Sequence, residues 1–208
     1  MTASDPDLVL TNVEAHLINV LGQDSGRADV TFLGTERMDV LRFGTDPDGL
    51  VRYVTIGMSR APMVDPGTEL VAPEDGPRAE LVLSVAGPRD SVLRQLATFA
   101  ASPAIEGVVI GPGAGLDLGE PLWEGSRFTA VLVGEPGELI PDLPLGTEEE
   151  PGEGLEPVRF LPLQPMTPSE AAWKRVHGAA ALEDAWRRAG IDPRDPDRPQ
   201  APLDRPAG

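Results

Sequence analysis

The side chains of this chain that could carry chemistry are few and scattered. The two histidines, His16 and His177, have neither a second histidine nor a carboxylate at the spacing of a metal site. We interpret both as ordinary surface or helix-end residues. Cysteine is absent, which excludes a thiolate nucleophile and a cysteine zinc site. The sequence therefore predicts no catalytic residue, no metal and no cofactor.

Residues 111–115 form a glycine-rich segment after a short apolar run, where a phosphate-binding loop would stand. Three residues after Gly113 stands Leu116, where the dinucleotide motif requires another glycine. Pro121 follows before any clear helix whose N-terminus could meet a phosphate. We interpret the segment as a tight turn or a bulge.

Acidic side chains are abundant, but their spacing singles out no catalytic pair. The chain has 34 Asp and Glu against 17 Lys and Arg, a formal net charge of −17. A hydrolase that uses two carboxylates stays an alternative without assigned residues. Glu148, Glu149 and Glu150 lack the alternating pattern of a calcium loop and are predicted to lie in a solvated loop. The charge opposes contact with nucleic acid, whose phosphates need basic residues.

The length and the apolar pattern indicate one soluble domain. A chain of 208 residues can bury a core without disulfides. It contains no run of 18 apolar residues, so we expect no membrane-spanning segment. The first six residues lack the basic and apolar stretches of a signal peptide. We therefore expect a cytoplasmic protein.

Periodicity and capping residues predict the following elements. Helices are expected over residues 5–21, over 91–101 with Pro103 as the stop, and over 168–189 with a bend at Gly178. Thr167 and Glu170 form the pattern of a capping box for the last helix. Strands are expected over residues 28–33, 38–43, 50–58, 79–86, 108–110, 128–133 and 158–163.

The order of these elements favours an α+β fold. Strands often follow one another directly, so we predict a single domain with a mixed, mostly antiparallel sheet and flanking helices. The domain is expected to cover residues 5–190. The tail, residues 191–208, has five prolines and no recognisable buried face, and it is predicted to be disordered. Residues 146–154 are predicted to form a mobile loop.

Several blocks, taken in order, resemble the suppressor-of-fused domain family, and in particular its short bacterial members. The blocks span about residues 10–190. In residues 53–59 an aromatic and apolar strand ends in glycine and serine, and in residues 79–83 an acid precedes alternating apolar residues. The remaining blocks are residues 91–101, 119–123, 128–132 and 158–170.

The resemblance implies a non-catalytic protein-binding domain rather than an enzyme. The animal relative holds an extended segment of a transcription factor by strand pairing. It has a second domain that this chain is too short to contain, so its binding residues are not transferred. The resemblance to the bacterial members of the family implies that this chain is an immunity protein, which neutralises a polymorphic toxin. An acidic surface would attract a basic toxin domain and speed their encounter.

The partner is expected to be another protein, either a basic toxin domain or a protein that offers an extended peptide. The residues predicted to contact it are Met58, Ser59, Arg60, Pro62 and Met63. The alternative is that these residues only close a strand into a loop. A regulatory or scaffolding role toward an endogenous protein is the alternative function, with a strand edge near residues 58–63 as the contact.

Overall fold

The computed structural model describes residues 5–32, 36–65, 67, 76–137, 139–145 and 155–203. The helices of this described part are α1 (Pro6–Leu21), α2 (Leu93–Glu106), α3 (Pro168–His177) and α4 (Ala179–Ala189), with two short 3-10 helices, η1 (Met58–Arg60) and η2 (Asp90–Val92). The strands are β1 (Asp24–Val30), β2 (Met38–Phe43), β3 (Leu50–Ile56), β4 (Arg78–Ala86), β5 (Gly115–Asp117), β6 (Ala130–Val133) and β7 (Val158–Met166).

The described strands form one seven-stranded sheet in the order β1-β2-β3-β4-β7-β6-β5. Strands β4 and β7 are parallel, with Leu81 beside Leu161, and the other five pairings are antiparallel. The sheet is therefore mixed and mostly antiparallel, and the predicted α+β class is confirmed. Strands β1 and β5 lie at its two margins.

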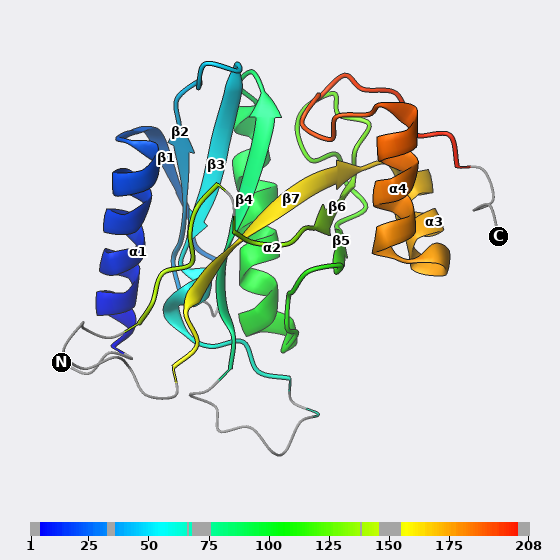
Figure 1. Cartoon of the computed structure of the whole chain (residues 1–208). Coiled ribbons are helices and arrows are strands. Elements are labelled where there is room, and N and C mark those ends of the chain that lie inside the picture. Colours follow the sequence, from blue (N-terminus) through cyan, green and yellow to red (C-terminus); the bar gives the residue numbers. More distant parts are fainter. Residues whose placement is uncertain are drawn as a thin grey trace.

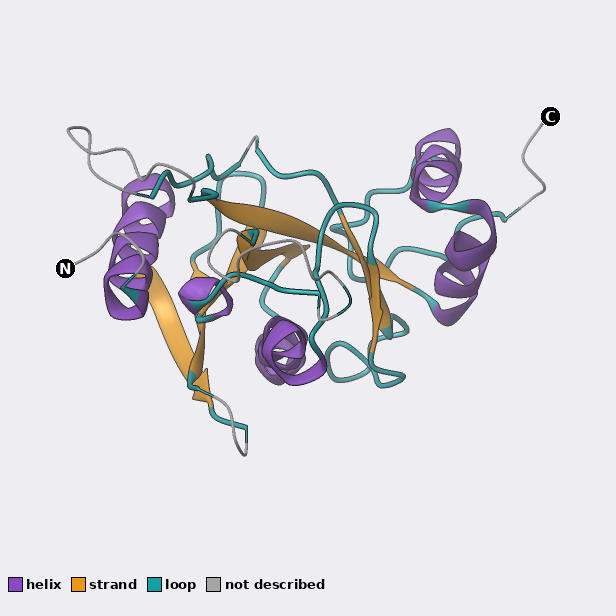
Figure 2. Cartoon of the chain, turned by 90° about the horizontal axis from the view of Figure 1, so that it is seen from below, coloured by secondary structure: helices purple, strands orange, loops and turns teal. Residues whose placement is uncertain are grey.

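Helices cover both faces of the sheet, and alternation along β4 explains why. Leu81 and Leu83 point into the core under α2, whereas Val82 points into the core under α1. A strand buried on both faces reads as a nearly continuous apolar run, as β4 does. Helix α2 lies on one face, and α1 and the α3–α4 pair lie on the other (Figures 1 and 2). The middle of that second face, over β4 and β7, lies between α1 and α3–α4.

Capping residues lie at the ends of α1 and α3. Asp5 accepts a hydrogen bond from the backbone of Asp7 at the start of α1, and Gly22 ends the helix. Thr167 and Glu170 form the predicted capping box at the start of α3. Gly178 divides the predicted long helix into α3 and α4.

Three element predictions need correction. Residues 108–110 are not a strand, and the edge strand of that region is β5, which begins at Gly115. Pro103 does not stop α2, which continues to Glu106. A proline in the last turn removes only one intrahelical hydrogen bond, which explains why the helix tolerates it. The first strand is Asp24–Val30 rather than residues 28–33.

The C-terminal segment also differs from its prediction. Residues 191–203 pack against the domain instead of lying disordered, while residues 204–208 are outside the described part. Arg198 and Ala201 are almost fully buried. The reason is a buried ion pair of Arg198 with Glu170, and hydrophobic patterning gives no sign of such a contact. The loop predicted over residues 146–154 lies outside the described residues.

Candidate functional site

The predicted contact residues lie where β3 turns into η1 and the loop that follows. Gly57 has φ of +135°, a conformation that residues with a side chain rarely adopt. It lets the chain leave the sheet and form η1, Met58–Arg60. Residues 58–63 therefore do not form a sheet edge, so they cannot pair with an added strand in the predicted way.

A buried carboxylate from the neighbouring strand fixes this turn. Oε1 of Glu80 accepts hydrogen bonds from the backbone N–H of Gly57 at 2.9 Å and of Ser59 at 3.0 Å. The same oxygen accepts from the Ser59 hydroxyl at 2.6 Å, and Oε2 accepts from the Thr55 hydroxyl at 2.7 Å. Burial raises the pKa of Glu80, although these four hydrogen bonds oppose the rise. Glu80 therefore positions the turn.

A buried arginine fixes the same turn from its other side. Nη1 of Arg78 donates to the carbonyl oxygens of Ser59 at 2.8 Å and Arg60 at 3.0 Å. Burial lowers the pKa of Arg78. Sequence reasoning missed the roles of Arg78 and Glu80. Their only signal in the sequence is a pair of charges, at positions 78 and 80, at the start of a strand that is otherwise mostly apolar.

Three of the five predicted contact residues are buried. Met58, Ser59 and Met63 are each less than a tenth exposed, whereas Arg60 and Pro62 are partly exposed. Ser59 is committed to Glu80. Ser59 is therefore unsuited to touch a partner, and Met58 and Met63 can do so only through the hollow that they line.

Four of the five line one apolar hollow, which we call the methionine hollow, with a volume of about 260 Å³. Its other apolar lining comes from β2 and from the C-terminal half of α2. The apolar residues that line it include Met38, Met58, Pro62, Met63, Ala100 and Ala104, and its charged lining residues are Glu36 and Arg60. Methionine side chains are flexible and polarisable, so such a surface can adapt to a partner's side chain.

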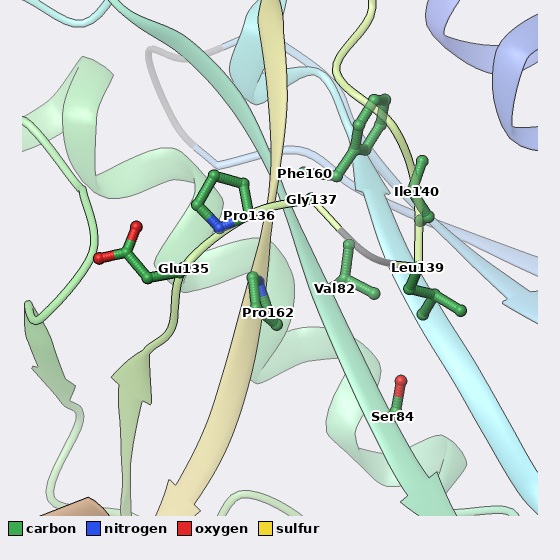
Figure 3. Close-up of a pocket in the computed structure, with 9 residues that line it drawn as sticks. All are labelled: Val82, Ser84, Glu135, Pro136, Gly137, Leu139, Ile140, Phe160 and Pro162. Atoms are coloured by element: carbon green, nitrogen blue, oxygen red, sulfur yellow. The ribbon is translucent and has the colours of Figure 1, made fainter.

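A second depression, the central groove, lies on the opposite face of the sheet over β4 and β7. Val82, Ser84 and Pro162 are shared by two adjoining hollows of about 400 and 330 Å³. Residues 135–137 pass over β7 and line the larger hollow together with Leu139 and Ile140 (Figure 3). Among the described lining of the larger hollow, Glu135 is the single titratable side chain. A pair of converging carboxylates, which a hydrolase would need, is not found in that lining.

A third surface, the apolar strip, lies at the end of α2 and beside the edge strand β5. Ile105, Val108 and Val109 are 55%, 37% and 44% exposed. Val108 and Val109 line a hollow together with Gly115 and Leu116 of β5. Neighbouring exposed apolar side chains are a common mark of a protein contact.

The two histidines, the remaining candidate residues, contact neighbouring residues of the fold. Nε2 of His16 donates to the carbonyl oxygen of Pro141 at 2.8 Å, and its ring stacks on Phe160. The ring of His177 lies 4.3 Å from that of Trp173. Within the described ranges, His, Asp and Glu form no group of three that could hold a metal ion. None of the helices described is long and apolar enough to cross a bilayer.

The glycine-rich segment is a turn, as its sequence indicates. Gly113 has φ of +80°, and its N–H donates to the carbonyl oxygen of Val133 at 2.7 Å. The segment leads into β5 rather than into a helix. Its surroundings therefore match a strand connection, not a helix N-terminus that binds phosphate.

These features define an α+β domain whose principal hollows are lined mostly by apolar side chains. The family model of suppressor of fused protein matches residues 34–199 of the chain. The chain belongs to the suppressor of fused family. No curated protein sequence matches the chain.

Solved structures of related proteins have the same fold. A structure described as a suppressor of fused homolog from Neisseria gonorrhoeae FA 1090 has 21% identity and a TM-score of 0.60, covering 91% of this chain and 94% of that one. A chain of the Sufu–Fu complex has 13% identity and a TM-score of 0.64, with 97% and 93% covered. Drosophila Suppressor of Fused has 12% identity and a TM-score of 0.62, and the match covers 93% of this chain but 50% of that protein.

Proposed function

We propose that this chain is a non-catalytic protein-binding domain that receives an apolar side chain of its partner in the methionine hollow. The observation that carries the proposal is that Met58, Arg60, Pro62 and Met63 line that one hollow. The fixed turn at Gly57 holds these residues in place before binding, which lowers the entropy cost of association. Family membership supports the same class of function, because suppressor of fused domains bind proteins.

The partner that suits the chain best is a basic toxin domain, which would make the chain an immunity protein. A net charge of −17 attracts a basic surface over distances near the Debye length and raises the association rate. Glu36, a charged residue in the lining of the methionine hollow, has no ion pair with another described residue. A basic residue beside the inserted apolar side chain would pair with it.

The apolar strip supports a second candidate function, regulation or scaffolding of an endogenous protein. An extended segment could add to the outer edge of β5 and cover Ile105, Val108 and Val109. Strand addition of this kind takes its affinity from backbone hydrogen bonds and its specificity from neighbouring side chains.

Copurification from the source cell, read by mass spectrometry, tests the proposed function. The native chain should retain a specific protein, and Ala104→Trp should lose it, because the indole fills the rim of the methionine hollow. Ala180→Trp, at a position on α4 that is likewise exposed, is the matched control and should retain the protein. Retention of the same protein by Ala104→Trp would refute the contact at this hollow.

Coexpression tests the immunity role separately. If a neighbouring gene encodes a secreted protein with a variable C-terminal domain, that domain should arrest growth when expressed alone. The native chain should restore growth, and Ala104→Trp should not. Capture of a housekeeping protein, with loss on Val108→Asp instead of Ala104→Trp, would favour the scaffolding function.

A further inference from the structure

Strand β1 presents an open edge at one margin of the sheet. In the described part of the chain its strand neighbour is β2 alone, and Figure 1 shows it at the end of the sheet beside α1. Its exposure alternates strictly from Asp24 to Val30. Ser25, Arg27 and Asp29 form the exposed row, and the residues between them are half-buried. An edge of this kind is a template for another strand.

The charges of the exposed row are incompletely paired within one chain. Arg27 pairs with Glu14 of α1 and lies 3.6 Å from Asp39. Asp29 stands directly opposite Asp39 in the β1–β2 ladder, and like charges at opposed positions are unfavourable. Asp29 has no ion pair of its own with another described residue. Arg37, which pairs with Asp39, offsets part of this repulsion. A cation approaching from the open side of β1 would give Asp29 an ion pair of its own.

We propose that β1 pairs with β1 of a second copy of this chain, antiparallel and centred on Ala28. Opposed residues of an antiparallel pair share a face of the sheet, so the two-fold axis must lie midway between one residue of β1 and the same residue of the second copy. A centre at Arg27 opposes two arginines, and a centre at Asp29 opposes two aspartates. With the centre at Ala28, Arg27 of each copy lies opposite Asp29 of the other, so two such pairs form.

The self-pairing is short and its affinity is weak. The β1–β2 register shifts between Asp24 and Gly26, so the regular part of β1 available for pairing is Gly26–Val30. Each copy also carries a net charge of −17, which opposes association. At about 0.15 M salt the Debye length is ~8 Å, so the charges at the edge dominate over the distant ones. The dimer is therefore expected at high protein concentration and physiological salt.

Reversing the charge at Arg27 or at Asp29 tests the pairing, and a general loss of stability would not produce the same pattern of results. Sedimentation equilibrium of the native chain should show a concentration-dependent dimer. Arg27→Asp opposes two aspartates and Asp29→Arg opposes two arginines, so each variant alone should be monomeric at concentrations where the native chain dimerises. An equimolar mixture should form a heterodimer, since aspartate then faces arginine at all four positions. Thermal unfolding of each variant confirms that it is folded.

A single cysteine reports the register directly, because the chain has no cysteine of its own. Directly opposed residues in antiparallel strands have Cα atoms about 4.5–5.5 Å apart, which suits a disulfide. Ala28→Cys should therefore form a disulfide-linked dimer under mild oxidation, and the control Ala180→Cys should not. A native chain that remains monomeric up to millimolar concentration would overturn the proposal. So would single charge variants that dimerise as readily as the native chain.

Discussion

Arg198 and Glu170, which are 28 residues apart in the sequence, form a buried ion pair. Nη1 and Nη2 of Arg198 each donate to one carboxylate oxygen of Glu170 at 2.8 Å, and both side chains are at most 1% exposed. Burial opposes ionisation of Glu170, but hydrogen bonds from Arg198, Thr167 and Ala201 hold its pKa below the ordinary value. The guanidinium also lies over the rings of Phe128 and Trp186. One ion pair thus joins the capping box of α3 to the C-terminal segment.

Arg198→Met should destabilise the fold by about 3–5 kcal/mol, because it leaves a buried carboxylate without its cation. Urea unfolding measures this change. Arg188→Met, which removes an exposed pair with Asp184, is the matched control and should cost less than ~1 kcal/mol. Equal effects of the two substitutions would show that the buried pair does not hold the C-terminal segment.

Glu80 should make the fold less stable as pH rises. Its pKa is raised in the folded state, so the folded chain keeps a proton that the unfolded chain loses above about pH 4.3. Stability is then lost at about 1.4 kcal/mol per pH unit until the folded group also ionises. Glu80→Gln does not titrate in this range.

The stability of the native chain relative to Glu80→Gln should therefore fall between pH 4.5 and the folded pKa and level off above it. Urea unfolding of both chains at a series of pH values gives this difference and cancels the contribution of the other carboxylates. A difference that grows in favour of the native chain with rising pH would contradict the assignment.

Tyr53 is the one tyrosine of the chain, so its ionisation can be followed without interference. Burial raises its pKa to about 12, and the hydrogen bond that its hydroxyl donates to Asp90 adds to the rise. Tyrosinate absorbance should have its midpoint near pH 12 in the folded chain and near pH 10 in urea. The folded chain retains the proton between these values, so stability should fall as pH rises through this window. Identical midpoints would refute the burial of this hydroxyl.

Gly57→Ala should damage the turn before η1. An added Cβ would lie 2.8 Å from Sδ of Met38 and 3.0 Å from the carbonyl oxygen of Arg37, at a φ that alanine rarely adopts. We expect a loss of about 1–3 kcal/mol in thermal or urea unfolding. Gly44→Ala, where nothing lies within 4 Å, is the matched control and should change stability little. A neutral effect of Gly57→Ala would remove the strain argument.

Local signals predicted the elements better than they predicted the site. The capping box of Thr167 and Glu170 depends on neighbouring residues, so the sequence shows it directly. The burial of Arg198 depends on a partner 28 positions away, and proline content pointed instead to disorder. Charged residues that become buried by pairing with distant partners are invisible to hydrophobic patterning.

The same reason explains the outcome for the candidate contact residues. The apolar and glycine pattern points to the segment after β3. It does not predict the turn that Glu80 and Arg78 impose on that segment. That turn buries Ser59 and directs Met58 and Met63 into a hollow completed by β2 and α2. Which helix closes a hollow depends on tertiary packing. The sequence could therefore indicate the contact residues but not the hollow that they line together.

Hydrogen exchange of the chain, free and bound to the protein that it retains from the source cell, tests the central claim most directly. Peptides that cover residues 58–63 and 100–104 should exchange more slowly in the complex, because the partner's apolar side chain fills the methionine hollow between them. Protection confined to β5 and the apolar strip, with unchanged exchange around the hollow, would contradict the claim.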